Sequence, residues 1–188
     1  MTDYFAVLGQ PRRPWLDPVR LKERYQQLTL AKHPDRAGSS ESDFALVNEG
    51  YRVLSNRKLR LQHLLSLQPG TISPNSAVPS EVAALFMETA SLLEEVDRLL
   101  GRLKTADNLL SKALLQSEVI DLREKTGAAL ENLAKLEAGA VQELCALDIK
   151  WEKQSENVTE ELAALSRRFA HLERWTEQLR ERQFQLSI

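Results

Sequence analysis

Apolar residues recur every three or four positions along the second half of the chain, from residue 81 to the end. Charged side chains fill the positions between them, which is the pattern of helices that bury one face. This pattern predicts long helices over residues 81–104, from about 105 to 151, and over 158–184. The apolar stripe expected in the second of these comprises Leu130, Leu133, Leu136, Val141, Leu144 and Leu147. Three such helices packed antiparallel would hide their apolar stripes, so we expect a three-helix bundle. The last stripe repeats about every 3.5 residues, as in a bundle or coiled-coil seam; it comprises Val158, Leu162, Leu165, Phe169, Leu172, Trp175 and Leu179.

The first part of the chain shows the same periodicity in shorter runs. Helices are predicted over residues 3–9, 18–32, 41–54 and 58–67. Gly, Pro, Asp and Ser separate the runs, and these residues cap or end helices. Asp17 is expected to cap the second of these helices, with Pro18 at its first position. Alternating Val, Ile and Thr, the mark of strands, is nearly absent. The fold class we expect is therefore all-α.

The clearest boundary is the segment QPGTISPNSAVPS at residues 68–80. Three prolines interrupt it, and a helix cannot run through them. We therefore expect a first domain over residues 1–68, a linker over 69–80 and a helical bundle over 81–188.

Charge is divided unevenly along a chain of 188 residues with a formal net charge of −2. Residues 1–70 carry 11 Lys and Arg against 7 Asp and Glu, and residues 71–188 carry 14 against 20. Such a division favours different partners for the two parts. The overall balance argues against a nucleic-acid-binding protein.

Cys145 is the only cysteine, which excludes an intrachain disulfide and a cysteine-based zinc site. No residues form a plausible cofactor or metal site. No apolar run reaches 18 residues, and the N-terminus lacks a leader pattern. We expect a cytoplasmic protein with no membrane partner.

Three segments of the first part occur in the order and at the offsets of a J-domain. They are DYFAVLG, LKERYQQLTLAKHPD and FALVNEGYRVLSNRKLR. Together they resemble the J-domain family, in which two antiparallel helices flank a His-Pro-Asp loop. The resemblance implies that this loop and the preceding basic helix contact a DnaK-type chaperone and trigger its ATP hydrolysis. The residues that it assigns to this contact are His33, Pro34, Asp35, Lys22, Arg24 and Lys32. For the three cations, a merely solvated helix face is the alternative.

His33 and Asp35 could also suggest catalysis. A catalytic pair would need a nucleophile or metal and a closed pocket as well, and the sequence shows neither. We therefore expect a protein that is not an enzyme and has no catalytic residues.

The second part lacks a Gly/Phe-rich stretch and zinc-ribbon cysteines, and it follows a short linker. This architecture, the opening DYFAVLGQPRRPWLDPVRLKERY and the later LFMETASLLEEVDRL resemble the HscB family, co-chaperones of iron–sulfur cluster assembly. The resemblance implies an L-shaped molecule whose J-domain engages the chaperone HscA and whose bundle binds the scaffold protein IscU. The client-binding residues that it implies are Phe86, Met87, Ala90, Ser91, Glu94 and Phe169, where Phe169 is preferred over Trp175.

This segment departs from the family pattern at two positions of the implied client patch. Ala90 and Ser91 stand where a leucine and a glutamate are usual. The departures keep a second hypothesis open, a co-chaperone of DnaK with another client, in which the bundle serves docking or dimerisation. Phe86 and Met87 could also be plain bundle core. We expect a monomer or a weak dimer.

Overall fold

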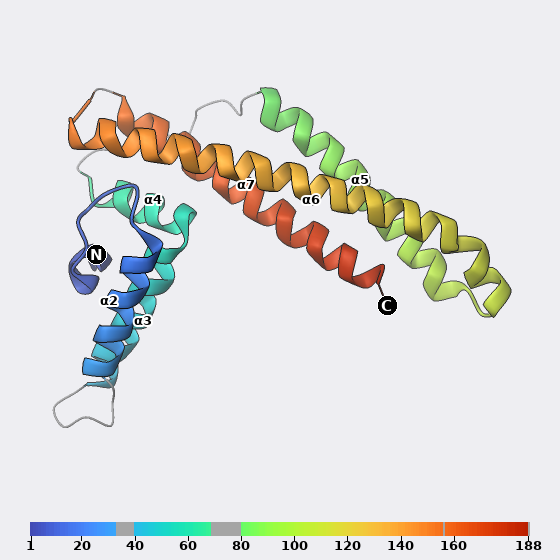
Figure 1. Cartoon of the computed structure of the whole chain (residues 1–188), viewed down its shortest axis with the longest axis horizontal. Coiled ribbons are helices and arrows are strands. Elements are labelled where there is room, and N and C mark those ends of the chain that lie inside the picture. Colours follow the sequence, from blue (N-terminus) through green and yellow to red (C-terminus); the bar gives the residue numbers. More distant parts are fainter. Residues whose placement is uncertain (33–39, 69–79, 156, 188) are drawn as a thin grey trace. The chain divides into compact units, whose positions relative to one another are not determined.

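The computed structural model describes residues 1–32, 40–68, 80–155 and 157–187, except for the side chains at 80–84 and 86. Within these ranges every regular element is a helix, which confirms the predicted all-α fold (Figure 1). The helices are α1 (Tyr4–Leu8), α2 (Pro18–Ala31), α3 (Glu41–Ser55), α4 (Arg57–Ser66), α5 (Ser80–Thr105), α6 (Leu109–Glu152) and α7 (Val158–Gln185). In the described part of the chain, no helix is long and apolar enough to cross a bilayer.

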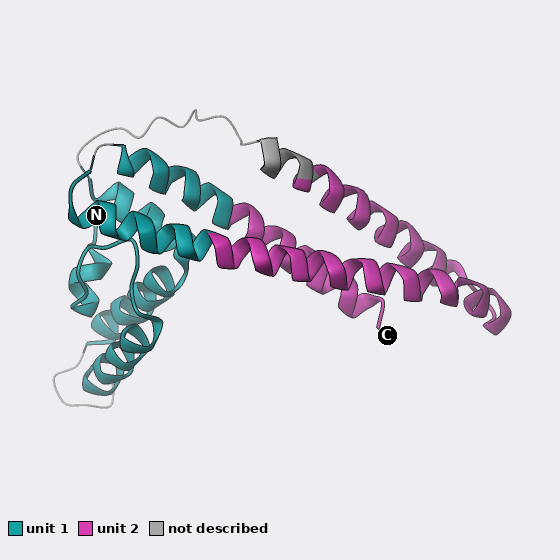
Figure 2. Cartoon of the chain, turned by 45° about the horizontal axis from the view of Figure 1, so that its top comes forward, with its two compact units in different colours: residues 1–74, 140–169 teal, residues 75–139, 170–188 magenta. Residues whose placement is uncertain are grey.

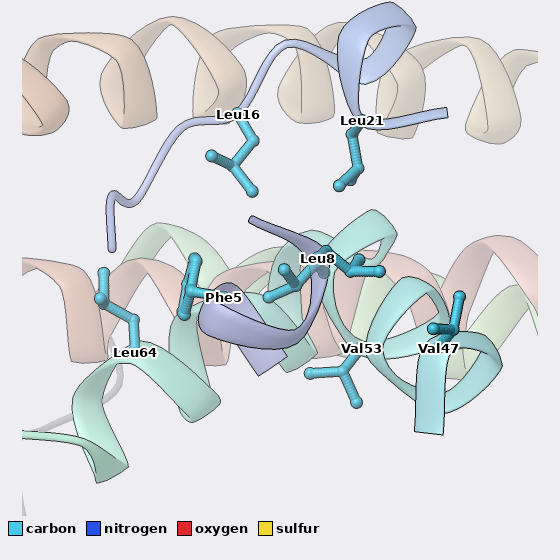
Figure 3. Packing of buried hydrophobic residues seen from close by; sticks show 8 residues of the cluster. Phe5, Leu8, Leu16, Leu21, Val47, Val53 and Leu64 are labelled. Atoms are coloured by element: carbon cyan, nitrogen blue, oxygen red, sulfur yellow. The ribbon is translucent and has the colours of Figure 1, made fainter. Parts of the chain in front are cut away.

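Helices α1 to α4 enclose a small apolar core (Figure 3). Phe5, Leu8 and Leu64 have no exposed surface, and Leu21 has 1%. Helix α1 is only five residues long, so its ends matter. The Asp3 carboxylate accepts the N–H groups of residues 5 and 6 at 3.0 and 3.3 Å.

Glycine is required directly after α1. Gly9 has a φ of +61°, the left-handed conformation that commonly ends a helix. A Cβ added at Gly9 would meet the guanidinium of Arg24 at 3.4 Å. Position 9 therefore combines a backbone requirement with a close approach by α2.

Helices α2 and α3 are joined by an aromatic and a polar contact. The rings of Tyr25 and Tyr51 stack with centroids 4.1 Å apart. The Tyr25 hydroxyl donates a hydrogen bond to Asn48 Oδ1 at 2.8 Å. Asp17 accepts the N–H groups at the start of α2, and Pro18 occupies its first position, as predicted. The contacts of Tyr25 with Tyr51 and Asn48 hold α2 against α3.

The chain divides into two compact units, drawn separately in Figure 2. Unit 1 comprises residues 1–74 and 140–169, and unit 2 comprises residues 75–139 and 170–188. Parts of α6 and α7 thus belong with α1 to α4. The boundaries expected from the sequence, and the L-shaped arrangement, stay predictions.

Unit 2 contains a core between α5, α6 and α7. The buried members are Val96, Leu99, Leu115, Val119, Leu122 and Leu186. At its surface, Arg182 Nε contacts Asp97 Oδ1 at 3.0 Å, and Arg102 contacts Glu118 at 2.7 Å. One residue of the predicted stripe differs, because Leu136 is 42% exposed. Periodicity placed Leu136 inward, whereas the structure places it at the surface of α6.

Candidate partner-binding surfaces

The cations assigned to the chaperone contact differ in their surroundings. Lys22 is exposed on α2. Arg24 is also exposed, but its Nε donates to the Leu8 carbonyl at 3.4 Å, so it also ties α2 to the end of α1. Lys32, which ends α2, contacts Asp43 on α3 at 3.4 Å. The structure thus places all three on or next to α2.

His33, Pro34 and Asp35 lie outside the described residues. What the structure does give is both ends of that segment. Helix α2 ends at Ala31, and α3 begins at Glu41 with Ser40 as its cap.

The residues assigned to the client patch are divided between surface and interior. On α5, Met87 is 67% exposed, and Glu94 is also exposed, whereas Ala90 is half-buried. The side chain of Phe86 lies outside the described residues. Of the two alternatives for Met87, core or contact, the structure supports the surface position.

Phe169 is placed differently from a client contact. Its side chain is only 5% exposed, within unit 1, and the guanidinium carbon of Arg57 lies 6.0 Å from its ring centroid. A buried aromatic cannot offer much surface to a partner. Its repeat position explains the burial, because Phe169 continues the apolar stripe of α7. We therefore correct its expected role to packing.

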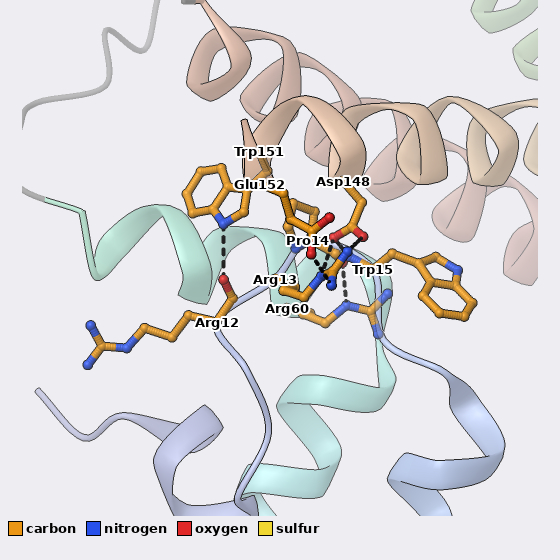
Figure 4. Close-up of polar contacts among 8 residues, drawn as sticks. All are labelled: Arg12, Arg13, Pro14, Trp15, Arg60, Asp148, Trp151 and Glu152. Carbon is orange, nitrogen blue, oxygen red and sulfur yellow. Dashed lines mark hydrogen bonds and ion pairs between the residues drawn. The ribbon is translucent and has the colours of Figure 1, made fainter. Parts of the chain in front are cut away.

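A polar cluster that the sequence did not suggest joins the loop before α2 to the end of α6 (Figure 4). Asp148, 4% exposed, accepts hydrogen bonds from the Arg13 guanidinium and from the backbone N–H of Trp15 at 3.1 Å. This pairing raises the pKa of Arg13. We call Arg13, Trp15, Arg60 and Asp148 the Asp148 cluster.

Arg60 is the buried cation of this cluster, 4% exposed. Its Nε donates to the Pro14 carbonyl at 2.9 Å and its Nη1 to the Leu54 carbonyl at 2.7 Å. Burial lowers the pKa of Arg60 to about 10, with Arg57 adding to this and Asp148 opposing it. The side chain stays charged at neutral pH and links three segments of unit 1.

Two further hydrogen bonds hold the same region together. Trp151 Nε1 donates to the Arg12 carbonyl at 3.0 Å, and Ser166 Oγ donates to the Lys58 carbonyl at 3.3 Å. The one feature of the sequence that could have indicated this cluster is Asp148 itself, a charged residue directly after Leu147 on an otherwise apolar face.

Metal chemistry finds no support among the described residues, where no group of three His, Cys, Asp or Glu could hold an ion. Cys145 is half-buried, as part of α6.

Comparison with known proteins finds a curated relative and solved structures of similar fold. No family model matches the chain. The curated co-chaperone protein HscB of Proteus mirabilis (strain HI4320) is 37% identical over 117 residues, which are 58% of this chain and 66% of that protein. The match therefore spans slightly less than two thirds of the relative's length.

Two solved structures share the fold over nearly the whole chain. Chaperone HscB from Vibrio cholerae superposes with a TM-score of 0.57 at 21% identity, covering 98% of this chain and 99% of that one. Human co-chaperone protein HscB gives 0.52 at 19% identity, covering 96% and 81%. At these identities the likeness concerns the fold alone.

Proposed function

We propose that this chain is a co-chaperone of the HscB family, which stimulates the ATPase of a DnaK- or HscA-type chaperone while delivering an IscU-type scaffold. In this proposal it performs no reaction of its own and acts in the cytoplasm. Residues 1–68 serve as the J-domain, 69–80 as linker and 81–188 as the client-binding part. The observation that carries the proposal is the HPD tripeptide between the paired helices α2 and α3, in a chain that resembles this family.

The chaperone contact is supported by the charge and packing of α2. Lys22 and Arg24 are exposed cations, and Lys32 lies directly before the tripeptide. Complementary charge speeds the encounter of two proteins more than it deepens their affinity. The stacked Tyr25 and Tyr51 hold α2 against α3, the two helices that precede and follow the tripeptide in the sequence.

The client contact is supported by the exposure of α5. Met87 offers a flexible, polarisable apolar side chain, a type that suits adaptable binding surfaces. The exposed carboxylate of Glu94 lies about two turns further along α5.

A single-turnover ATPase assay with a purified DnaK- or HscA-type chaperone tests the chaperone role. The unaltered chain should accelerate hydrolysis, and His33→Gln should return the rate to that of the chaperone alone. Gln62→Ala, at an exposed position of α4, is the matched control and should stimulate fully. Equal stimulation by His33→Gln would contradict the proposal.

A pull-down with a purified IscU-type scaffold tests the client role. Met87→Ala combined with Glu94→Lys should weaken capture, whereas Glu131→Lys on an exposed position of α6 should not. Capture that the double variant leaves unchanged would reject the α5 patch.

A second candidate function is favoured by Ala90 and Ser91, which replace the usual leucine and glutamate of the patch. In that case the chain is a DnaK co-chaperone with another client, and α5 to α7 serve docking or dimerisation. The unaltered chain would then stimulate the ATPase without capturing the scaffold, and analytical ultracentrifugation would separate the dimer version from a monomer.

A further inference from the structure

Within unit 2, α5 and α6 leave a groove of about 750 Å³ between them. Helix α5 contributes Leu85, Met87 and Leu92 to its lining, and α6 contributes the buried Leu133. The remaining lining from α6 includes Ala128 and Ala129, the second of which is half-buried. Because both side chains are small, they leave space in the groove on the side of α6. We call this feature the α5–α6 groove.

The charges around the groove are unbalanced. Glu88 and Glu95 line it, and the exposed Glu94 lies next to Glu95 on α5. Within the described residues, neither Glu88 nor Glu94 forms an ion pair. Among the described lining residues the one cation is Lys125, which is paired with Asp121 at 2.8 Å and also interacts with Glu95. The groove therefore presents apolar walls and net negative charge, which suits an apolar segment that also carries Lys or Arg.

The groove continues the proposed client patch around α5. Met87 and Ser91 belong to both, because each lines the groove and each matches a client-binding position. The patch itself has lost apolar area and a carboxylate at Ala90 and Ser91. In the groove, Leu85 and Leu92 supply apolar area and Glu88 supplies a carboxylate.

We propose that the client occupies the α5–α6 groove as well as the exposed face of α5. An apolar client side chain enters beside Leu85 and Leu92, and a neighbouring Lys or Arg of the client meets Glu88 and Glu95. Ala128 and Ala129 determine which clients fit, because longer side chains there would fill the space. This inference rests on the client role proposed above and extends the contact to α6.

The test fills the groove without adding charge. Ala128→Leu together with Ala129→Leu keeps good helix formers on α6. Binding of a purified IscU-type scaffold to the full chain that carries both changes is measured by calorimetric titration. Excluding one buried apolar side chain should raise Kd by about tenfold or more. Ala134→Leu makes the same change at an exposed α6 position outside the groove lining and should leave Kd unchanged.

Glu88→Gln removes the charge at almost constant shape. It should raise Kd and weaken the dependence of Kd on salt, since a charged contact across the interface is lost. A thermal melt monitored by circular dichroism checks that each variant stays folded, and stimulation of the chaperone without client should be unchanged.

The outcomes separate the two proposals. Scaffold binding that falls in both groove variants and persists in Ala134→Leu supports the groove. If the unaltered chain binds and the folded Ala128→Leu/Ala129→Leu variant binds equally well, the groove is overturned while the client role stands. If the unaltered chain does not bind the scaffold, the client role fails and the groove assignment fails with it.

Discussion

The short helices α1 to α4 and the long helices of unit 2 are stabilised in different ways. Each of the four short helices begins with a side chain that accepts backbone N–H groups, from Asp3, Asp17, Ser40 and Asn56. Helices this short are marginal alone. Helices α5, α6 and α7 have 26, 44 and 28 residues and bury long apolar stripes, although Asn108 also accepts a backbone N–H at the start of α6. Single polar contacts should therefore matter more in the first region than in the second.

The largest expected effect comes from the small core. Phe5 is completely buried, so Phe5→Ala should lower the free energy of unfolding of α1 to α4 by about 3–5 kcal/mol. Hydrogen exchange followed by mass spectrometry should show lost protection in α1 to α4 and retained protection in unit 2. Phe184→Ala, at a side chain 67% exposed, is the control and should change little. Equal loss of protection in α1 to α4 and in unit 2 would contradict the proposed difference in how the two regions are stabilised.

The next largest effect should follow from Asp148→Ala. This change leaves Arg60 buried without its carboxylate neighbour and takes away the partner of Arg13. Because hydrogen bonds to charged groups contribute more than neutral ones, a loss of about 2 kcal/mol is expected in urea unfolding. Glu152→Ala removes the exposed partner of Arg13 instead and should cost far less. Similar costs for the two variants would show that burial of the Asp148 cluster is unimportant.

A smaller effect is expected from a helix cap. Asp17→Ala removes the acceptor for the N–H groups of Val19 and Arg20, which should cost about 1 kcal/mol. Faster amide exchange at the start of α2 would reveal it. In unit 2, Asp121→Ala breaks only an exposed ion pair and should cost about 0.5 kcal/mol or less. A larger loss of unfolding free energy in Asp121→Ala than in Asp17→Ala would contradict the difference between the two regions.

The smallest effect concerns pH. His63 Nε2 accepts the Tyr4 N–H at 3.1 Å, and the imidazole stacks on Phe5 at 5.6 Å. Burial lowers the pKa of His63, with Asp3 opposing this and Arg12 supporting it. Below about pH 6.5 the unfolded chain binds a proton that the folded chain does not, so stability should fall as the pH decreases until the folded pKa is reached. His63→Gln should flatten that part of the stability profile, and an unchanged profile would contradict the assignment.

Periodicity and capping residues were sufficient to predict the helices. The stretch expected at 18–32 is α2 at Pro18–Ala31, and the one expected at 81–104 is α5 at Ser80–Thr105. These signals are local, because Asp17, Pro18 and the linker prolines act on their own neighbourhood.

Contacts between distant segments could not be predicted in the same way. An apolar stripe indicates which face of a helix is buried, but it does not show which segment covers that face. Leu136 was therefore predicted to be buried. Phe169 was assigned to client binding, although it lies on such a stripe. The Asp148 cluster joins residues about 135 positions apart in the sequence. The α5–α6 groove depends on how closely two helices pack, which neither sequence nor spacing states.

The placement of the chain's three tryptophans gives each unit its own optical reporter. Trp15 and Trp151 belong to unit 1, where Trp15 donates its backbone N–H to Asp148 and the indole of Trp151 donates to Arg12. Trp175 belongs to unit 2, where it is 4% exposed and stacks on His171 at 5.5 Å. Intrinsic fluorescence of a Trp175→Phe variant would therefore follow the melting of unit 1 alone, and its difference from the unaltered chain would follow unit 2.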